Sequence, residues 1–264
     1  MPKGFELPRR HFLHAGLVAA CGLTLSGCDA FDALSDADNP VRNFMEGTNS
    51  LTWRVQRFLQ GRDALAQEFA RSDIRQPQRP NGVTNPQDED YLALAAANFK
   101  NYRLSIGGLV ENPLALGLPQ LQAMPARTQI TRHDCVEGWS CIAQWTGTRL
   151  SQLLELARPR PQARYVVFNC FDTIEQSLSG AVKYYESIDL SDARHPQTIL
   201  AWGLNDKPLP VENGAPLRLR VERQLGYKMA KYVRSIELVD SFATLGDGEG
   251  GYWEDRGYEW YAGI

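Results

Sequence analysis

Residues 131–140 read Thr-Arg-His-Asp-Cys-Val-Glu-Gly-Trp-Ser and form the most informative segment of the chain. A strand-like run, residues 128–131, leads into the segment and is followed by Cys135 among polar, charged and aromatic neighbours. A thiolate is a soft ligand that suits a transition metal, and an adjacent Arg132 or protonated His133 favours the deprotonated form of a thiol. The setting predicts a metal-binding Cys135, and the alternative is an inert buried cysteine.

A metal cage built from protein side chains alone does not fit this sequence. The chain has no Cys-x-x-Cys pair, and the two histidines that follow residue 27, His133 and His195, lie far apart. Structural zinc sites need four protein ligands at close, regular spacing. A metal held by the single thiolate of Cys135 would therefore take its other ligands from an organic cofactor, an arrangement that molybdopterin provides.

Two blocks of sequence resemble the sulfite oxidase family of molybdenum enzymes. The first is Cys-Val-Glu-Gly-Trp-Ser (135–140), followed by Trp-Thr-Gly (145–147) and a leucine-rich helix. The second runs through residues 195–231 and includes Asn-Gly-Ala-Pro-Leu-Arg (213–218) and Gly-Tyr-Lys-Met-Ala-Lys (226–231). The match covers about residues 102–242, and within the family it is most similar to the periplasmic protein-methionine-sulfoxide reductase catalytic subunits.

The resemblance implies a molybdenum and molybdopterin cofactor, with Cys135 as both the metal ligand and the catalytic residue. It also implies the cofactor-binding residues Asn213, Arg218, Met229, Ala230, Lys231, Cys170, Asn49, Thr52 and Trp53. A phosphate group is held well by a guanidinium, a lysine and backbone N–H groups, which suits the roles of Arg218 and Lys231. Taken alone, Arg218 also fits a solvated position on an alternating strand.

Departures from the family pattern bear on the substrate. Gly138 and Cys141 replace bulkier residues that are common in the reductases, and Cys170 stands where the relatives carry a threonine. The sulfite-type segment Cys-Ala-Gly-Asn-Arg-Arg is missing from the sequence. Reduction of an S-oxide or N-oxide is therefore expected, with oxidation of a sulfite-like small substrate as the alternative.

The amino-terminal 27 residues are expected to be an export signal. Arg9 and Arg10 precede an apolar run that is too short to span a bilayer, a pattern similar to a twin-arginine signal. The small residues before Cys28 resemble a lipobox, which predicts a lipid-anchored protein on the periplasmic side of the inner membrane. The alternative is an ordinary signal peptide in which Cys28 has no role.

The cysteines that follow Cys28 are Cys135, Cys141 and Cys170, an odd number that excludes a complete disulfide framework. A disulfide between Cys135 and Cys141 stays open as an alternative to metal binding by Cys135.

The expected fold class is α+β, with a molybdopterin-binding fold whose β-sheet core is barrel-like and whose helices are peripheral. Alternating side chains predict strands at residues 102–106 and 217–221, both half-buried, and further strands at 165–168 and 235–239. Helices are expected at residues 88–99 and 150–157, with one or two more within 50–69, and residues 75–88 are expected to be extended. The expected divisions are an export signal (1–27), a tether (28–48), a helical and wrapping segment (49–98), the cofactor-binding core (99–245) and an aromatic tail (246–264), which covers the core or docks a partner.

The net charge and the motifs that the sequence lacks limit the classes of partner that the protein could bind. Without residues 1–27 the chain has 25 Lys and Arg against 30 Asp and Glu, so its net charge of −5 argues against nucleic-acid binding. No haem-attachment motif or dinucleotide fingerprint occurs, so electrons must come from a separate protein, for which a membrane-bound b-type cytochrome is expected. The substrate is expected to be a small molecule or a methionine-sulfoxide-like group, and the competing class is a non-catalytic lipoprotein that retains the fold.

Overall fold

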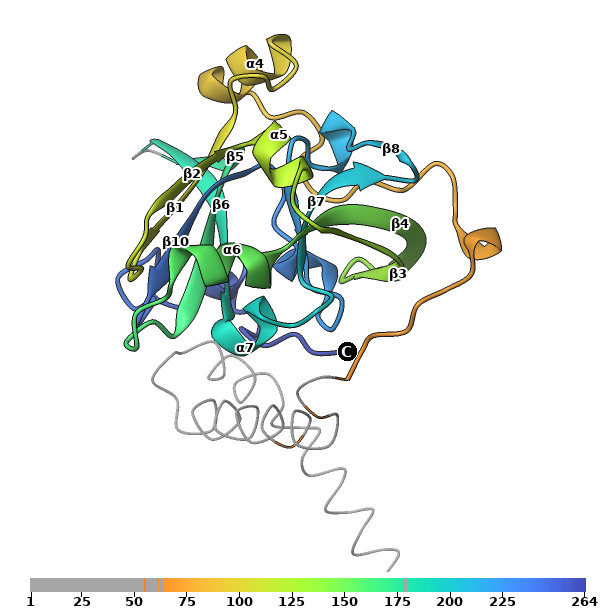
Figure 1. Cartoon of the computed structure of the whole chain (residues 1–264). Coiled ribbons are helices and arrows are strands. Elements are labelled where there is room, and N and C mark those ends of the chain that lie inside the picture. The colour runs from red at the N-terminus through yellow and green to blue at the C-terminus, as the bar shows by residue number, and fades with distance from the viewer. Residues whose placement is uncertain (1–54, 56–60, 62–63, 178–179) are drawn as a thin grey trace, which may run out of the picture. The chain divides into compact units, whose positions relative to one another are not determined.

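The structure is a computed structural model, and it describes Val55, Gly61 and residues 64–177 and 180–264. Within these residues, ten strands form two five-stranded sheets that lie side by side (Figure 1). The first sheet has the order β2 (Leu114–Gly117), β1 (Arg103–Gly108), β10 (Val233–Val239), β5 (Tyr165–Ser177) and β6 (Gly180–Asp189). The second has the order β3 (Ala126–Cys135), β4 (Trp139–Arg149), β7 (Ile199–Leu204) and β8 (Lys207–Pro208), and β9 (Arg218–Arg220) also pairs with β7.

The first sheet joins the two ends of the core. β1 pairs in parallel with β10, which is more than a hundred residues later in the chain, and antiparallel with β2. A parallel pair needs a long crossover, and here the crossover is the rest of the core, including the whole second sheet. Both blocks of the family resemblance lie within this crossover.

Short helices surround the sheets. They are α4 (Glu89–Ala96), α5 (Leu118–Gln122), α6 (Leu150–Ala157) and α7 (Leu190–Ala193), together with the 3-10 turns η2 (Arg71–Asp73), η3 (Val211–Asn213), η4 (Gly226–Lys228) and η5 (Glu254–Arg256). α4 begins after Asp88, whose side chain accepts a hydrogen bond from the backbone of Tyr91. α6 buries Leu150, Leu153 and Leu154 at helical spacing.

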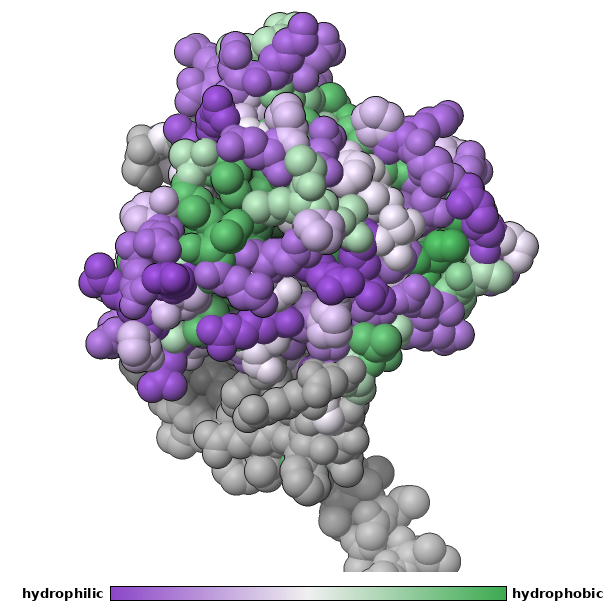
Figure 2. Space-filling model, viewed as in Figure 1, coloured by the Kyte–Doolittle hydropathy of each residue, from purple (hydrophilic) through white to green (hydrophobic). Residues whose placement is uncertain are grey.

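The main hydrophobic core lies against the first sheet. Leu104 and Ile106 alternate with exposed residues along β1, and they pack with Val166 and Phe168 of β5 and with the leucines of α6. A smaller cluster around Trp145 lies in the second sheet. The face shown in Figure 2 is mostly hydrophilic, with separate apolar patches.

The predicted α+β class and most of the predicted elements are confirmed. Strands lie at 103–108, 165–177, 218–220 and 233–239, and helices lie at 89–96 and 150–157. The prediction that residues 217–221 form a half-buried strand is wrong, because all of β9 is buried. Its polar side chains, Arg218 and Arg220, pack on the ring of Trp145, so a polar side chain does not mark an exposed position here.

The helix predicted within residues 50–69 does not extend over residues 64–69, which contain no regular element. The backbone of residues 69–75 is hydrogen-bonded to the second sheet: Phe69 N donates to Ile130 O at 2.9 Å, and Arg75 N donates to Ile142 O at 3.0 Å. This segment runs along the outside of β3 and β4 (Figure 1). Between residues 50 and 63 the structure describes only Val55 and Gly61, and the export signal, the tether and the lipid-modified Cys28 fall outside the described residues.

No helix among the described residues is both long and apolar enough to cross a bilayer.

The aromatic tail packs on the core: the centroid of the Trp260 ring lies 5.4 Å from that of Tyr165 and 5.7 Å from that of Phe242, and Tyr252 is buried. The backbone of Ile264 also donates to Arg223 O at 3.0 Å.

Candidate cofactor site

Cys135 is the last residue of β3, at the tip of the hairpin that β3 forms with β4. It is paired with Trp139, and the turn between them closes with a hydrogen bond from Gly138 N to Cys135 O at 3.0 Å. Gly138 has a φ of +81°, a conformation that glycine adopts with little strain. Cys135, Cys141 and Cys170 are all free thiols in the structure, so the alternative disulfide is not formed.

Cys135 is half-buried and faces a cavity of about 180 Å³. The wall comes from five parts of the chain that are distant in sequence: residues 81–83, the hairpin tip at 135–137, strands β5 and β6, the loop 226–231, and Trp253 of the tail. The cavity therefore exists only after both sheets and the tail have come together.

The electrostatic setting of Cys135 differs from the sequence-based expectation. Burial raises the pKa of the thiol, and the hydrogen bond from the backbone of Glu137 only partly opposes this. Arg132 does not stabilise a thiolate, because its side chain is half-exposed and pairs with Asp134 at 2.8 Å. Neither Arg132 nor a protonated His133 therefore favours the thiolate as expected, and the charge of Arg79 lowers the pKa of the thiol by less than burial raises it. Deprotonation is left to a bound metal, which displaces the thiol proton.

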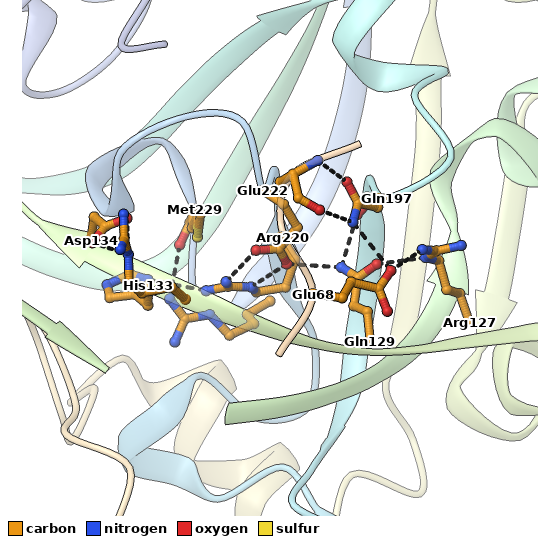
Figure 3. Close-up of polar contacts among 12 residues, drawn as sticks. Glu68, Arg127, Gln129, His133, Asp134, Gln197, Arg220, Glu222 and Met229 are labelled. Atoms are coloured by element: carbon orange, nitrogen blue, oxygen red, sulfur yellow. Dashed lines mark hydrogen bonds and ion pairs between the residues drawn. The ribbon is translucent and has the colours of Figure 1, made fainter. Parts of the chain in front are cut away.

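His133 is buried and neutral. Burial, followed by the charge of Arg220, lowers the pKa of its imidazole well below the usual value. Its Nδ1 lies 3.0 Å from Nη1 of Arg220, which can only donate, so Nδ1 is the acceptor and the proton is on Nε2 (Figure 3). Among the described residues this Nε2–H has no hydrogen-bond partner.

Two arginines lie side by side on the ring of Trp145, and only one of them is neutralised by a carboxylate among the described residues. Arg220 forms a two-pronged ion pair with Glu222, with N–O distances of 2.9 and 2.6 Å (Figure 3). Arg218 has no carboxylate partner among the described residues, although it is 2% exposed. Its guanidinium donates to the carbonyl of Asn213 at 3.0 Å and, at 3.4 Å, to Asn81 and to the carbonyl of Met229. A buried charge without a counterion calls for a bound anion.

Lys231 adds a second buried cation. Its ammonium donates to the carbonyls of Asn81 at 2.6 Å and Glu212 at 2.9 Å, and also to that of Val83. Burial, followed by the charge of Arg218, lowers the pKa of Lys231 to about 7, and burial lowers that of Arg218 to about 9. Both cations are therefore held under electrostatic strain that an anion would relieve.

The site has buried hydrogen-bond donors without partners, which suits a phosphate-bearing cofactor. Among the described residues, Nδ2 of Asn213 and Nε of Arg218 are buried donors without partners. Unpaired buried donors are rare in folded proteins and are commonly explained by a missing ligand. Here they lie beside the two cations, as the phosphate role predicted for these residues requires.

The sequence-predicted residues do not all reach the cavity. Cys135, Met229 and Lys231 line it, and Asn213 and Arg218 lie directly behind Met229 and Lys231. Cys170 is buried within β5, where its thiol points back to Phe168 O at 4.0 Å, and it is not part of the cavity wall. Ala230 is also away from the wall, and its carbonyl accepts a hydrogen bond from Leu219.

The sequence prediction missed residues 81–83. They line the cavity and bind both cations through Asn81 and Val83, whereas the predicted Asn49, Thr52 and Trp53 lie outside the described residues. The only signal in the sequence was the Asn-Gly pair at 81–82, which indicates a turn and says nothing of a distant partner.

The fold and the site together fit an oxidoreductase that binds a phosphate-bearing metal cofactor, because the free thiol of Cys135 and the ammonium of Lys231 line one cavity and Arg218 lies behind it. The chain belongs to the oxidoreductase molybdopterin-binding domain family, whose model matches residues 91–244. It is thus a molybdopterin-dependent oxidoreductase, which confirms the predicted family, cofactor and enzyme class.

Similar proteins agree with this assignment. The chain is 36% identical over 262 residues to a putative protein-methionine-sulfoxide reductase subunit, YedZ1, of Azospira oryzae, a match that covers 99% of this chain and 90% of the relative. It is 34% identical over 149 residues to the protein-methionine-sulfoxide reductase catalytic subunit MsrP of Campylobacter jejuni, covering 54% of this chain and 50% of the relative. The corresponding protein of Xanthomonas axonopodis is 37% identical over 145 residues, covering 53% and 45%.

The chain therefore spans about half the length of the two MsrP relatives and nearly all of the Azospira protein. Among solved structures, the sulfane dehydrogenase SoxCD of Paracoccus pantotrophus is similar, with 24% identity and a TM-score of 0.48 over 54% of this chain and 39% of that one.

Proposed function

We propose that this protein reduces S-oxides, of which methionine sulfoxide is the type, with the two-electron chemistry that a bound molybdenum cofactor would supply. The observation that carries the proposal is the cavity that Cys135 and Lys231 line, with Arg218 directly behind it, buried and without a carboxylate partner among the described residues. The first supplies a metal ligand and the other two supply a phosphate site. The direction of the reaction and the class of substrate are supported by the names of the relatives, which are methionine-sulfoxide reductases.

The cavity wall beside Cys135 suits a thioether-like group. Val136, Ile174, Tyr227, Met229 and Trp253 give it a largely apolar lining. Reduction of an S-oxide consumes two electrons and two protons, releases water and leaves an apolar sulfide, for which such a wall is favourable. When bound, the cofactor supplies the two-electron chemistry, and the residues of the chain hold and shield it.

The proposal includes an external electron donor and a membrane location. A membrane-bound b-type cytochrome is the proposed donor, because the sequence has no haem-attachment motif of its own. Export to the periplasm and acylation of Cys28 would keep the enzyme close to that donor and raise its effective concentration. Arg9 and Arg10 support export by the twin-arginine route, which carries proteins that have folded around their cofactor.

The test is an assay of the full chain, expressed with its signal and purified from membranes. Molybdenum is measured first, and about one metal per chain is expected. Turnover is then followed in both directions: oxidation of a reduced dye by methionine sulfoxide, and reduction of an oxidised dye by sulfite. We expect activity in the first direction and little in the second.

Cys135→Ser is the matched variant, because it replaces the thiol with a smaller hydroxyl at a half-buried turn position. We expect turnover to fall by at least a thousandfold, while the thermal midpoint of unfolding stays within about 2 °C. A variant with unchanged turnover would remove Cys135 from its role as metal ligand. If sulfite oxidation were the faster reaction, the proposed substrate class would be wrong. If the wild-type protein contained no molybdenum, the alternative of a non-catalytic lipoprotein would be favoured.

A further inference from the structure

Asp172 lies at an irregularity of β5. The pairing of β5 with β6 is regular up to Asn169, which is opposite Tyr185, and resumes at Thr173, which is opposite Lys183. Three residues of β5 therefore face one residue of β6 across this gap. Such bulges redirect side chains and are frequent next to active sites. Here the bulge brings Asp172 to the wall of the cavity that also holds Cys135 and Lys231.

Asp172 is a buried carboxyl with an unused oxygen. The residue is 3% exposed, and its Oδ1 has no hydrogen-bond partner among the described residues. Burial raises the pKa of this carboxyl to about 7, although Lys231 and Lys183 partly oppose the rise. A buried carboxyl in this state lowers the stability of the fold, so its presence needs a reason outside the fold.

Other buried carboxylates of the described core show what a structural role looks like. Glu222 is bound at both oxygens by Arg220, and Glu186 receives the ammonium of Lys228 at 2.5 Å. Asp172 has no such counterion in contact: Lys183 pairs with Asp88, and Lys231 donates to backbone carbonyls. Its free oxygen is thus available to whatever fills the cavity.

The chemistry of Asp172 indicates which part of the cofactor it would meet. Asp172 lines the same cavity as Cys135 and Lys231. A carboxylate accepts hydrogen bonds, so it suits neither a phosphate nor a metal-bound thiolate, and it needs a donor. The edge of a pterin carries ring N–H and amino N–H donors, which a carboxylate is suited to accept.

We propose that Asp172 is an additional cofactor-binding residue, whose Oδ1 accepts a hydrogen bond from an N–H group of the pterin. The cations Arg218 and Lys231 bind the negative end of the cofactor, and Asp172 binds its donor edge. The inference rests on the molybdopterin cofactor that the proposed function uses, and it is independent of the substrate.

A binding residue and a structural residue respond to substitution in opposite ways. Removal of a structural carboxylate destabilises the cofactor-free fold. Removal of a buried carboxylate that has a partner only when the cofactor is bound stabilises the cofactor-free fold and weakens cofactor binding. The two measurements together separate the roles.

The test compares Asp172→Ala and Asp172→Asn with the wild type and with Glu155→Ala, which removes an exposed carboxylate of α6. Each full-length protein is expressed once with the cofactor and once in cells that cannot make molybdopterin. Molybdenum and pterin per folded chain are measured on the first set, and the thermal midpoint of unfolding is measured on the second.

We expect Asp172→Ala to retain less than a fifth of the wild-type molybdenum and pterin. Its cofactor-free form is expected to melt about 2–4 °C higher than the cofactor-free wild type. Asp172→Asn keeps a carbonyl acceptor and is expected to retain at least half of the cofactor, and Glu155→Ala is expected to match the wild type in both measurements.

Full loading of Asp172→Ala would overturn the inference and leave the proposed function intact. A lower melting temperature of its cofactor-free form would assign Asp172 to the fold instead. Loading of Asp172→Asn as poor as that of Asp172→Ala would overturn the hydrogen-bond role. A wild type without molybdenum would overturn this inference together with the proposed function.

Discussion

At the scale of single residues, the site depends on how buried charges are compensated. Arg218 and Arg220 lie two residues apart on β9, are almost fully buried, and stack on the ring of Trp145 with guanidinium-to-centroid distances of 4.9 and 4.4 Å. Arg220 is fully occupied by Glu222 and His133, whereas Arg218 contacts only carbonyl and amide oxygens. From this difference we infer that Arg220 is a structural residue and that Arg218 is available to bind an anion.

Substitution of each arginine by methionine tests this difference. Arg220→Met leaves Glu222 buried without a partner and is expected to lower the free energy of unfolding by about 3–5 kcal/mol. Arg218→Met removes a charge that has no counterion, so we expect a change within about 1 kcal/mol but a loss of cofactor affinity of at least about tenfold. Denaturant unfolding of the cofactor-free proteins and molybdenum content of the loaded ones measure the two effects. Equal destabilisation by both substitutions would contradict the assignment.

We expect Lys231 to make cofactor retention depend on pH. Its pKa is about 7 in the empty site, and a bound phosphate would raise it, because an adjacent anion favours the ammonium form. The contribution of Lys231 to affinity is therefore complete below about pH 7 and is lost as the pH rises from there through the higher pKa of the loaded protein.

We expect the cofactor to be released faster as the pH is raised from 7 to 9, as followed by molybdenum in the filtrate. Lys231→Met is the control: it should release the cofactor faster at pH 7 and show a flatter dependence on pH. A wild type whose release does not change over this range would show that Lys231 does not hold the cofactor as an ammonium.

At the scale of elements, the second sheet depends on a close approach of two strands. Gly147 of β4 lies against β7 at a shift in their register. A Cβ at this position would lie 2.3 Å from the carbonyl oxygen of Leu200, a backbone atom that cannot rotate away. The strand that leads from the Cys135 hairpin into α6 therefore requires a glycine here.

Gly147→Ala is expected to lower the free energy of unfolding by about 1–3 kcal/mol, because the strands must separate to admit the methyl group. The matched control is Gly107→Ala in β1, where a Cβ would meet no atom within 4 Å and φ is not positive. That substitution should be neutral or slightly stabilising. Urea unfolding of both variants measures the difference, and an equal effect would contradict the close approach of β4 and β7.

At the scale of the whole molecule, the tail is bound to the core through a buried cation. Lys228, in the loop that lines the cavity, lies between Glu186 of β6 and Glu254 of the tail, and all three side chains are at most 1% exposed. The two carboxylates raise the pKa of Lys228 against the effect of its burial. This triad joins β6, the loop 226–231 and the tail, and the tail in turn provides Trp253 for the cavity wall.

Lys228→Met leaves two carboxylates buried together without a cation, and we expect it to lower the free energy of unfolding by about 3–5 kcal/mol. Protease cleavage within residues 246–264 should also become faster, because the tail loses its ion pair. Lys207→Met, which removes an exposed lysine of β8, is the control and should change stability by less than about 0.5 kcal/mol. If both variants unfold alike, the triad does not hold the tail.

Much of the fold could be predicted because local patterns and tertiary packing agree. The alternation around Leu104 and Ile106 predicted β1, and the leucines of 150–157 predicted α6, since each pattern places apolar side chains on one face. Predictions failed where long-range contacts prevail. The charged residues of β9 indicated an exposed face, but their partners Trp145 and Glu222 allow complete burial.

The sequence by itself determined the cofactor class and predicted Cys135 as the metal ligand, because the blocks around Cys135 and at 195–231 are contiguous and can be recognised without a fold. Only the tertiary structure decided which charges are free for a ligand. Whether the charges of Arg218, Lys231 and Asp172 are neutralised depends on residues from distant parts of the sequence. Asn81, for example, binds both Arg218 and Lys231 and lies 150 residues before Lys231. A side chain in the sequence has a charge, and its role depends on the neighbours that folding brings to it.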